Sequence, residues 1–134
     1  MASIRREIII QAKPDAVWDA VRDVGAVHRR LVPGFVVDTR LEDGARVVTF
    51  ANGVVARELI VDVDDATRRL VWSVTGSPRL THHNASMQVI AQDERQSLVV
   101  WIADVLPHDF APYMAGQMDL GLAAMQKSLG RKAA

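Results

Sequence analysis

The chain has 134 residues, the length of one typical domain, and it contains no cysteine. Disulfides and thiolate metal sites are therefore excluded. Its 16 basic and 16 acidic side chains leave no net charge, which argues against nucleic acid, a partner that usually requires a basic face.

The apolar runs are too short for a membrane segment. The longest, at 98–103, falls far below the roughly 20 residues that span a bilayer. Near the start, Arg5, Arg6 and Glu7 precede only three isoleucines, unlike the apolar core of a signal peptide. We therefore expect one soluble, cytoplasmic domain over residues 1–134, with 130–134 as a loose tail.

The first quarter of the chain predicts one strand and two short helices. Residues 4–10 are rich in isoleucine and read as a strand. Pro14 followed by Asp15 is typical of the first turn of a helix, which we expect Gly25 to end. A second short helical segment is predicted at 26–31, where a Pro-Gly pair stops it.

The middle of the chain predicts a meander of six strands separated by turn residues. They cover residues 35–41, 46–50, 54–63, 69–75, 80–91 and 97–105. The pair Asn52-Gly53 is the strongest short hairpin signal. It predicts a type I′ turn, which needs positive φ at both positions.

A long helix is predicted over residues 110–129, about 30 Å at 1.5 Å per residue. Asp109 is expected to cap it, Pro112 fits its first turn, and Gly130 suits its end. Its apolar face must pack against the sheet. The predicted fold is therefore α+β, with a curved antiparallel sheet of about seven strands wrapped around a long C-terminal helix.

Three motifs follow one another along this pattern: Ala-Val-Trp-Asp at 16–19, Arg-Glu-Leu at 57–59, and Val-Val-Trp at 99–101. In this order they resemble the SRPBCC superfamily, which includes START-like, Bet v 1-like and polyketide cyclase/dehydrase proteins. The resemblance covers nearly the whole chain and implies a single domain with the helix-grip fold. It also implies a cavity between sheet and long helix, where members of the family bind hydrophobic ligands.

Side-chain alternation selects residues for the cavity on two strands. On 80–91 the odd positions are mostly apolar, so His83 and Met87 are predicted to face inward and His82 to face water. On 69–75 the inward residues are predicted to be Leu70, Trp72 and Val74.

Alternation alone does not decide the strands at 54–63 and 97–105, because both faces carry apolar residues. For the first of them, the resemblance places Glu58 and Ile60 inward. For the second, it places Val100, Ile102 and Asp104 toward the cavity. This arrangement supplies no inward arginine, although some cyclases of the family use one to hold the substrate.

The stripe of the long helix that faces the sheet contains three methionines and a glycine. Methionine fills irregular space, and a glycine inside a helix costs about 1 kcal/mol relative to alanine. Both suit a surface against which something variable packs. The resemblance places Tyr113, Gln117 and Gly121 against the ligand, and it places deeper in the core Met118, Leu122 and Met125.

The main prediction is a protein that binds a small hydrophobic ligand, lipid-, polyketide- or aromatic-like, because a few polar groups in an apolar cavity are typical of such sites. An alternative is a polyketide aromatase/cyclase or dehydratase that uses Glu58, His83 and Tyr113 as proton-transfer groups. A second alternative is a protein-interaction or co-chaperone-like module. Its apolar patch on the outer face of the sheet would comprise Val55, Leu59 and Val61.

No cofactor or metal is expected. His82 and His83 are neighbours on a strand, so they point to opposite faces and cannot bind one ion together. The expected partner is a small hydrophobic molecule, without nucleic acid or membrane insertion. The outer patch leaves open a monomer or a homodimer.

Overall fold

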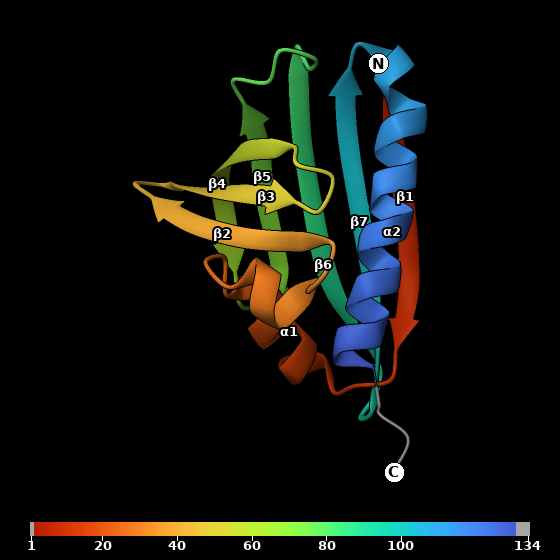
Figure 1. Ribbon diagram of the computed structural model, residues 1–134. Helices are drawn as coiled ribbons and strands as arrows, with labels where there is room; N and C mark the ends of the chain where they lie inside the picture. The colour runs from red at the N-terminus through yellow and green to blue at the C-terminus, as the bar shows by residue number, and fades with distance from the viewer. Residues whose placement is uncertain (1, 131–134) are drawn as a thin grey trace.

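Seven strands form one antiparallel sheet in the computed structural model, which describes residues 2–130 (Figure 1). The strands are β1 (Ala2–Ile10), β2 (Val36–Glu42), β3 (Ala45–Phe50), β4 (Val55–Asp64), β5 (Arg69–Thr75), β6 (His82–Asp93) and β7 (Gln96–Leu106). The helical segments are α1 (Pro14–Arg22), the π-helical η1 (Val27–Leu31), the 3₁₀ turn η2 (His108–Phe110) and α2 (Ala111–Leu129). Residues 131–134 of the predicted tail lie outside the described residues.

The order of strands in the sheet is β1-β7-β6-β5-β4-β3-β2, so the first strand pairs with the last. The pairing is antiparallel throughout, with Ile8 opposite Val99 in the β1–β7 pair. Helix α2 runs along the sheet beside β1 and β7, and α1 lies at one end of the sheet (Figure 1). The predicted α+β helix-grip fold is therefore confirmed.

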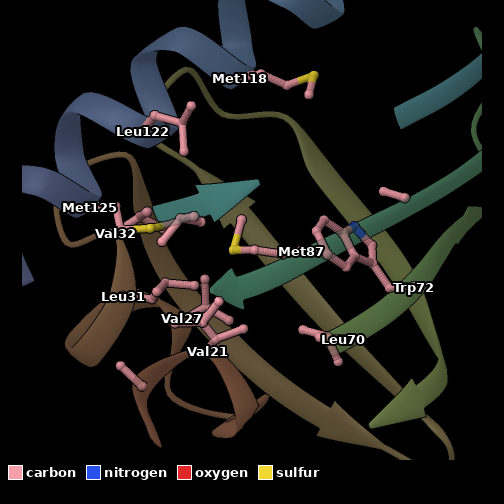
Figure 2. Close-up of a cluster of buried hydrophobic side chains, with 14 of the residues drawn as sticks. Val21, Val27, Leu31, Val32, Leu70, Trp72, Met87, Met118, Leu122 and Met125 are labelled. Carbon is pink, nitrogen blue, oxygen red and sulfur yellow. The ribbon is translucent and has the colours of Figure 1, made fainter. Parts of the chain in front are cut away.

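The core lies between the inner face of the sheet and the helices. Figure 2 shows Leu70 and Met87 projecting from the strands toward Leu122 and Met125 of α2. All four side chains are buried, and burial of one large aliphatic side chain contributes about 1.5–3 kcal/mol. Within residues 2–130, no helix is long and apolar enough to cross a membrane.

The hairpin between β3 and β4 does not use the predicted type I′ turn. Gly53 has a φ of +89°, but Asn52 does not adopt positive φ. The N–H of Gly53 donates to the carbonyl of Phe50, whose own N–H donates to the carbonyl of Val54, which defines a loop of three residues. The side chain of Asn52 accepts a hydrogen bond from the N–H of Val54 at 3.0 Å, and this local bond stabilises the wider loop.

The prediction that Asp109 caps the long helix was also wrong. Asp109 lies inside η2, and the residue that caps α2 is Phe110, without a side-chain hydrogen bond. Because the 3₁₀ turn occupies residues 108–110, α2 begins only at Ala111, and its capping residue lies one position later than predicted. At the other end, Gly130 has a φ of −63°, so no left-handed residue terminates α2.

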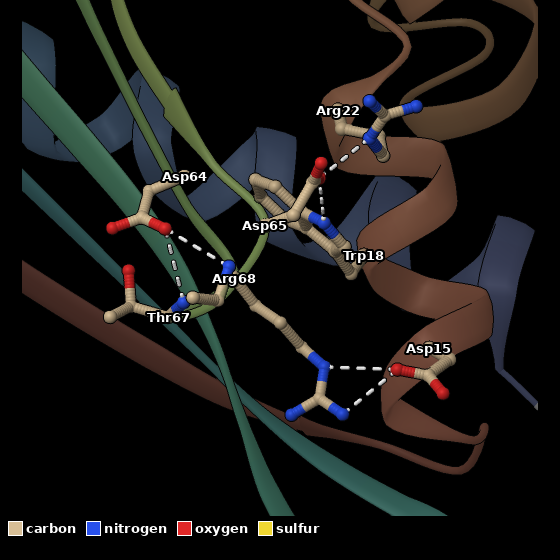
Figure 3. Close-up of polar contacts among 8 residues, drawn as sticks. Asp15, Trp18, Arg22, Asp64, Asp65, Thr67 and Arg68 are labelled. Carbon is tan, nitrogen blue, oxygen red and sulfur yellow. Dashed lines mark hydrogen bonds and ion pairs between the residues drawn. The ribbon is translucent and has the colours of Figure 1, made fainter.

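A cluster of polar contacts ties α1 to the turn between β4 and β5 (Figure 3). The carboxylate of Asp65 accepts hydrogen bonds from Trp18 Nε1 and Arg22 Nε, both at 2.8 Å. These two donors lower the pKa of Asp65 below its usual value. Arg68 donates to Asp15 at 2.8 Å, so the turn contacts α1 at two points and holds it across the end of the sheet.

The three apolar residues of β4 that the sequence analysis assigned to an outer patch are exposed, but they do not form one outer surface. Val55 and Val61 are 60% and 57% exposed, and Leu59 is exposed to a lesser extent. Leu59 points outward because its neighbour Glu58 points inward. Val55, in contrast, borders the pocket on the inner side of the sheet, and Val61 lies at a bulge of the strand.

Two glycines of α2 provide a matched test of how closely this helix approaches the sheet. A Cβ at Gly121 would lie 2.9 Å from Cζ3 of Trp101, whereas a Cβ at Gly116 meets nothing within 4 Å. We expect Gly116→Ala to stabilise the fold by up to about 1 kcal/mol, the ordinary helix gain. Gly121→Ala should instead destabilise it by about 1 kcal/mol, because overpacking exceeds that gain. Urea unfolding measures both, and equal stabilisation by the two variants would contradict the close contact.

Candidate functional site

A cavity of about 480 Å³ lies between the inner face of the sheet and the N-terminal half of α2. It has room for roughly 16 water molecules at the ~30 Å³ that each occupies in the liquid. Most of its wall is apolar or aromatic. The apolar residues include Phe35, Phe50, Trp72, Val74, Leu80, Trp101, Phe110, Met114 and Met118. Its size and character are those of a pocket for a small molecule.

Six of the twelve predicted ligand-binding residues line this cavity. They are Glu58, Trp72, Val74, His83, Tyr113 and Gln117. Three others are elsewhere: Leu70 and Met87 are buried in the core, and Gly121 lies against Trp101 rather than against open space.

The predicted orientation of β7 was wrong for Val100, Ile102 and Asp104, which do not line the cavity. In the register between β6 and β7, Trp101 lies opposite Met87, an inward residue of β6. Residues opposite each other in an antiparallel pair point to the same face, so β7 directs its odd positions inward. Val100, Ile102 and Asp104 therefore belong to the outer face of the sheet.

The sequence analysis missed most of the wall that comes from loops and from β7. Trp101 was not predicted among the ligand-binding residues, and neither were the four residues Phe35, Phe50, Leu80 and Phe110. Each of these four lies next to a turn or at the end of an element. Large apolar residues beside turns are the signal that could have identified them, because residues at such positions are otherwise often exposed.

A buried ion pair lies at the cavity wall. Nε of Arg46 on β3 donates to Oε1 of Glu58 on β4 at 2.7 Å, and the two residues are only 4% and 7% exposed. They are directly opposite in the β3–β4 register, so both face inward. The guanidinium also lies 5.5 Å from the ring centroid of Trp72. The prediction of an inward Glu58 agrees with this geometry, and the prediction that no arginine faces inward was wrong.

His83 contributes a neutral imidazole to the cavity wall. Nδ1 accepts a hydrogen bond from the backbone N–H of Val74 at 3.1 Å, so the ring proton resides on Nε2. Burial lowers the pKa of His83 to about 4, and the neighbouring His82 adds to that effect. At neutral pH the ring is therefore an uncharged donor.

The mouth of the cavity is bordered by Asn52, Arg79 and Tyr113. Nδ2 of Asn52 donates to the hydroxyl oxygen of Tyr113 at 3.1 Å. The guanidinium of Arg79 lies 4.7 Å from the ring centroid of Tyr113 and 4.8 Å from that of Phe110. Two loops that are distant in sequence thus contact the start of α2. Within residues 2–130, no group of three histidine or acidic side chains is arranged to hold a metal ion.

Comparison with known proteins places this geometry in a family. The model of the family described as polyketide cyclase/dehydrase and lipid transport matches residues 1–130. The chain belongs to this family. Membership supports a ligand-binding or cyclase role in general. No curated protein matches the chain in sequence.

Solved structures share the fold at low sequence identity. The XoxI protein from Bacillus cereus is 20% identical, with a TM-score of 0.86 and 96% of each chain covered. A Thermobifida fusca protein is 25% identical, with a TM-score of 0.78 and 99% of each chain covered. Norcoclaurine synthase from Thalictrum flavum, in complex with dopamine and hydroxybenzaldehyde, is 18% identical, with a TM-score of 0.69 and coverage of 94% of this chain and 84% of that one.

The buried pair predicts a characteristic double-mutant result. Arg46→Met and Glu58→Leu, made singly, each leave one charge of the pair buried without its partner, and we expect either to destabilise the fold by about 3–5 kcal/mol. Replacing both residues, as Arg46→Met with Glu58→Leu, should recover most of that loss because no charge remains to be desolvated. Denaturant unfolding of the two single variants and the double variant provides the measurement. Additive losses in the double variant would argue against a coupled pair.

The lowered pKa of His83 predicts how stability depends on pH. An unfolded histidine titrates near 6.5 and His83 near 4, so between these values the unfolded state binds more protons. The contribution of His83 is complete above pH 6.5 and is lost as the pH falls, by about 3 kcal/mol at pH 4. We expect His83→Gln to show a shallower decline of unfolding free energy from pH 7 to 4 than the wild type. Equal slopes would contradict a buried neutral ring, and His82→Gln, on the exposed neighbour, is the control.

Proposed function

We propose that the chain binds a small hydrophobic molecule in the cavity between the sheet and α2. The observation that carries this proposal is a space of about 480 Å³ whose wall is mainly apolar and aromatic, with few polar groups. This combination is typical of sites that bury most of the surface of a ligand and orient it through one or two polar contacts. Family membership supports the same function.

The size of the cavity limits the ligand. Room for roughly 16 water molecules corresponds to a molecule of about that many non-hydrogen atoms, because a methylene group and a water molecule have similar volumes. A single chain, or two or three fused rings, fits this volume. In a protein of the same fold, norcoclaurine synthase, the molecules bound are of this smaller kind, dopamine and hydroxybenzaldehyde.

The geometry gives less support to catalysis by Glu58, His83 and Tyr113. Oε1 of Glu58 already accepts a short hydrogen bond from Arg46, so this oxygen is held by the protein itself. One nitrogen of His83 is occupied by the backbone of β5. These two groups are thus held in fixed hydrogen-bonding roles, which suits the positioning of a ligand better than the exchange of protons.

The first test is binding of N-phenyl-1-naphthylamine, a neutral fluorescent probe of suitable size. We expect saturable binding with one site per chain. Val74→Phe, which fills part of the cavity, should weaken it at least tenfold, because the added ring occupies the space of the probe. Val61→Phe places the same ring at an exposed position that does not line the cavity and should leave the affinity unchanged.

Thermal unfolding would establish that both variants are folded. If the wild type shows no saturable binding, or if a folded Val74→Phe binds as tightly as the wild type, the proposed function is wrong.

A further inference from the structure

Some polar atoms at the wall of the cavity have no partner in the protein, and they differ in whether a ligand can reach them. Within residues 2–130, Nη1 of Arg46 and Nε1 of Trp101 have no hydrogen bond and are closed off from open space. Oε2 of Glu58 and Nε2 of His83 also have no hydrogen-bond partner there, but neither is closed off in this way. Because Glu58 and His83 line the cavity, a ligand inside it can contact both atoms.

Glu58 and His83 lie in one row across three neighbouring strands. Glu58 of β4 is opposite Val74 of β5, and the N–H of Val74 donates to Nδ1 of His83 on β6 at 3.1 Å. Neighbouring strands are about 4.8 Å apart, so the two polar residues are about two such spacings from each other. Val74 lies between them and also lines the cavity. A ligand that covers Val74 therefore comes close to both polar groups.

The open oxygen of Glu58 makes a purely apolar ligand costly. Glu58 is only 7% exposed, whereas Tyr113 and Gln117 at the start of α2 are partly buried. An apolar molecule that fills the cavity displaces water from Oε2 and leaves this carboxylate oxygen without a hydrogen bond, which costs more than the same loss at a neutral group. A ligand with a hydrogen-bond donor at this point restores the bond.

The neighbouring charge decides which kind of donor suits Oε2. Arg46, itself buried, already donates to Oε1 of the same carboxylate at 2.7 Å. An ammonium group at Oε2 would place a second cation beside that carboxylate in an apolar environment, at a large desolvation cost. A carbonyl, an ether or a carboxylate has no hydrogen to donate and would turn its lone pairs toward Oε2. A hydroxyl group is neutral and supplies one hydrogen.

The two other arginines of the cavity wall do not alter this choice. Arg57 donates through Nε to Glu42 at 3.0 Å and through Nη1 to the hydroxyl of Thr75 at 3.2 Å. Arg79 is exposed at the mouth, where its guanidinium lies against two aromatic rings. An anionic group of a ligand would thus bind at the mouth beside Arg79 and not beside Glu58.

We propose that the ligand carries a hydroxyl group, of an alcohol or a phenol, which donates a hydrogen bond to Oε2 of Glu58 while the apolar part of the ligand covers Val74. This inference rests on the proposed function and adds the chemical class of the ligand. An oxygen elsewhere on the same ligand can accept from Nε2 of His83 on the other side of Val74.

Three naphthalenes of similar size test the proposal in competition with N-phenyl-1-naphthylamine. 2-Naphthol carries the O–H, 2-methoxynaphthalene keeps the oxygen without a hydrogen to donate, and 2-methylnaphthalene has neither. We expect 2-naphthol to bind at least about tenfold more tightly than 2-methoxynaphthalene, the gain of one hydrogen bond to a charged group. 2-Naphthol should also bind more tightly than 2-methylnaphthalene, although the latter is more hydrophobic.

Glu58→Gln reverses the polarity of the site and assigns the preference to this residue. The carbonyl oxygen of the glutamine keeps the hydrogen bond from Arg46, so its NH₂ group takes the place of Oε2. We expect the ratio of 2-naphthol to 2-methoxynaphthalene affinity to fall about tenfold, because the ether can accept from this NH₂ group and the O–H no longer meets a carboxylate.

Two further variants support this comparison. Asp62→Asn removes the same charge from an exposed position of β4 that does not line the cavity, and it should keep the wild-type ratio. Arg46→Met with Glu58→Leu removes the acceptor and leaves no buried charge behind. This double variant should also lose the preference for 2-naphthol, and it provides the measurement if Glu58→Gln does not fold.

The outcomes separate this inference from the function on which it rests. If the fluorescent probe does not bind, the proposed function fails and the inference fails with it. If the probe binds but the wild type does not prefer 2-naphthol to the ether, binding stands and the inference is wrong. A preference that persists in folded Glu58→Gln would assign the hydroxyl to another group and contradict the inference. Tightest binding by 2-naphthoate that is lost in Arg79→Gln would place the polar head at the mouth and overturn it as well.

Discussion

The contact between Trp101 and Gly121 determines how α2 sits on the sheet. A tryptophan on the central part of β7 meets Gly121 of the helix, where no side chain intervenes, so helix and sheet approach closely there. Beyond this contact, Leu122 and Met125 are buried in a filled core. Before it, Tyr113 and Gln117 line an open space. One wide residue opposite one small residue thus divides the interior into a solid half and a hollow half.

The polar groups that lie at the wall of the hollow half come from neighbouring strands of the sheet. Arg46 and Glu58 are paired across β3 and β4, and His83 is bonded to the backbone of β5. Both arrangements place polar atoms at the wall without leaving a net charge in it. The hydrogen bonds within the protein offset part of the cost of burying these groups.

Local sequence patterns predicted the elements and the inward residues of β5 and β6, because a polar and an apolar set alternate there. For β4, the family resemblance and not the pattern placed Glu58 inward. The patterns did not predict the orientation of β7, since both of its faces are apolar and only the register with β6 decides between them. They also missed Arg46. A charged residue on a short strand is ordinarily predicted to face solvent. Its buried partner, Glu58, becomes apparent only when the register between β3 and β4 is known.

Pairing of β1 with β7 has a consequence for how the fold forms. Ile8 and Val99 are directly opposite although they are about ninety residues apart in the chain, so this pair closes a very long loop. The hairpins from β2 to β7 involve mostly near neighbours and can assemble before it. We therefore expect the barrier to folding to be dominated by the late arrival of β1 at the edge of an already formed meander. Until that step, the backbone N–H and C=O groups on the edge of β7 that later pairs with β1 are unpaired, and a strand of another chain can pair with them.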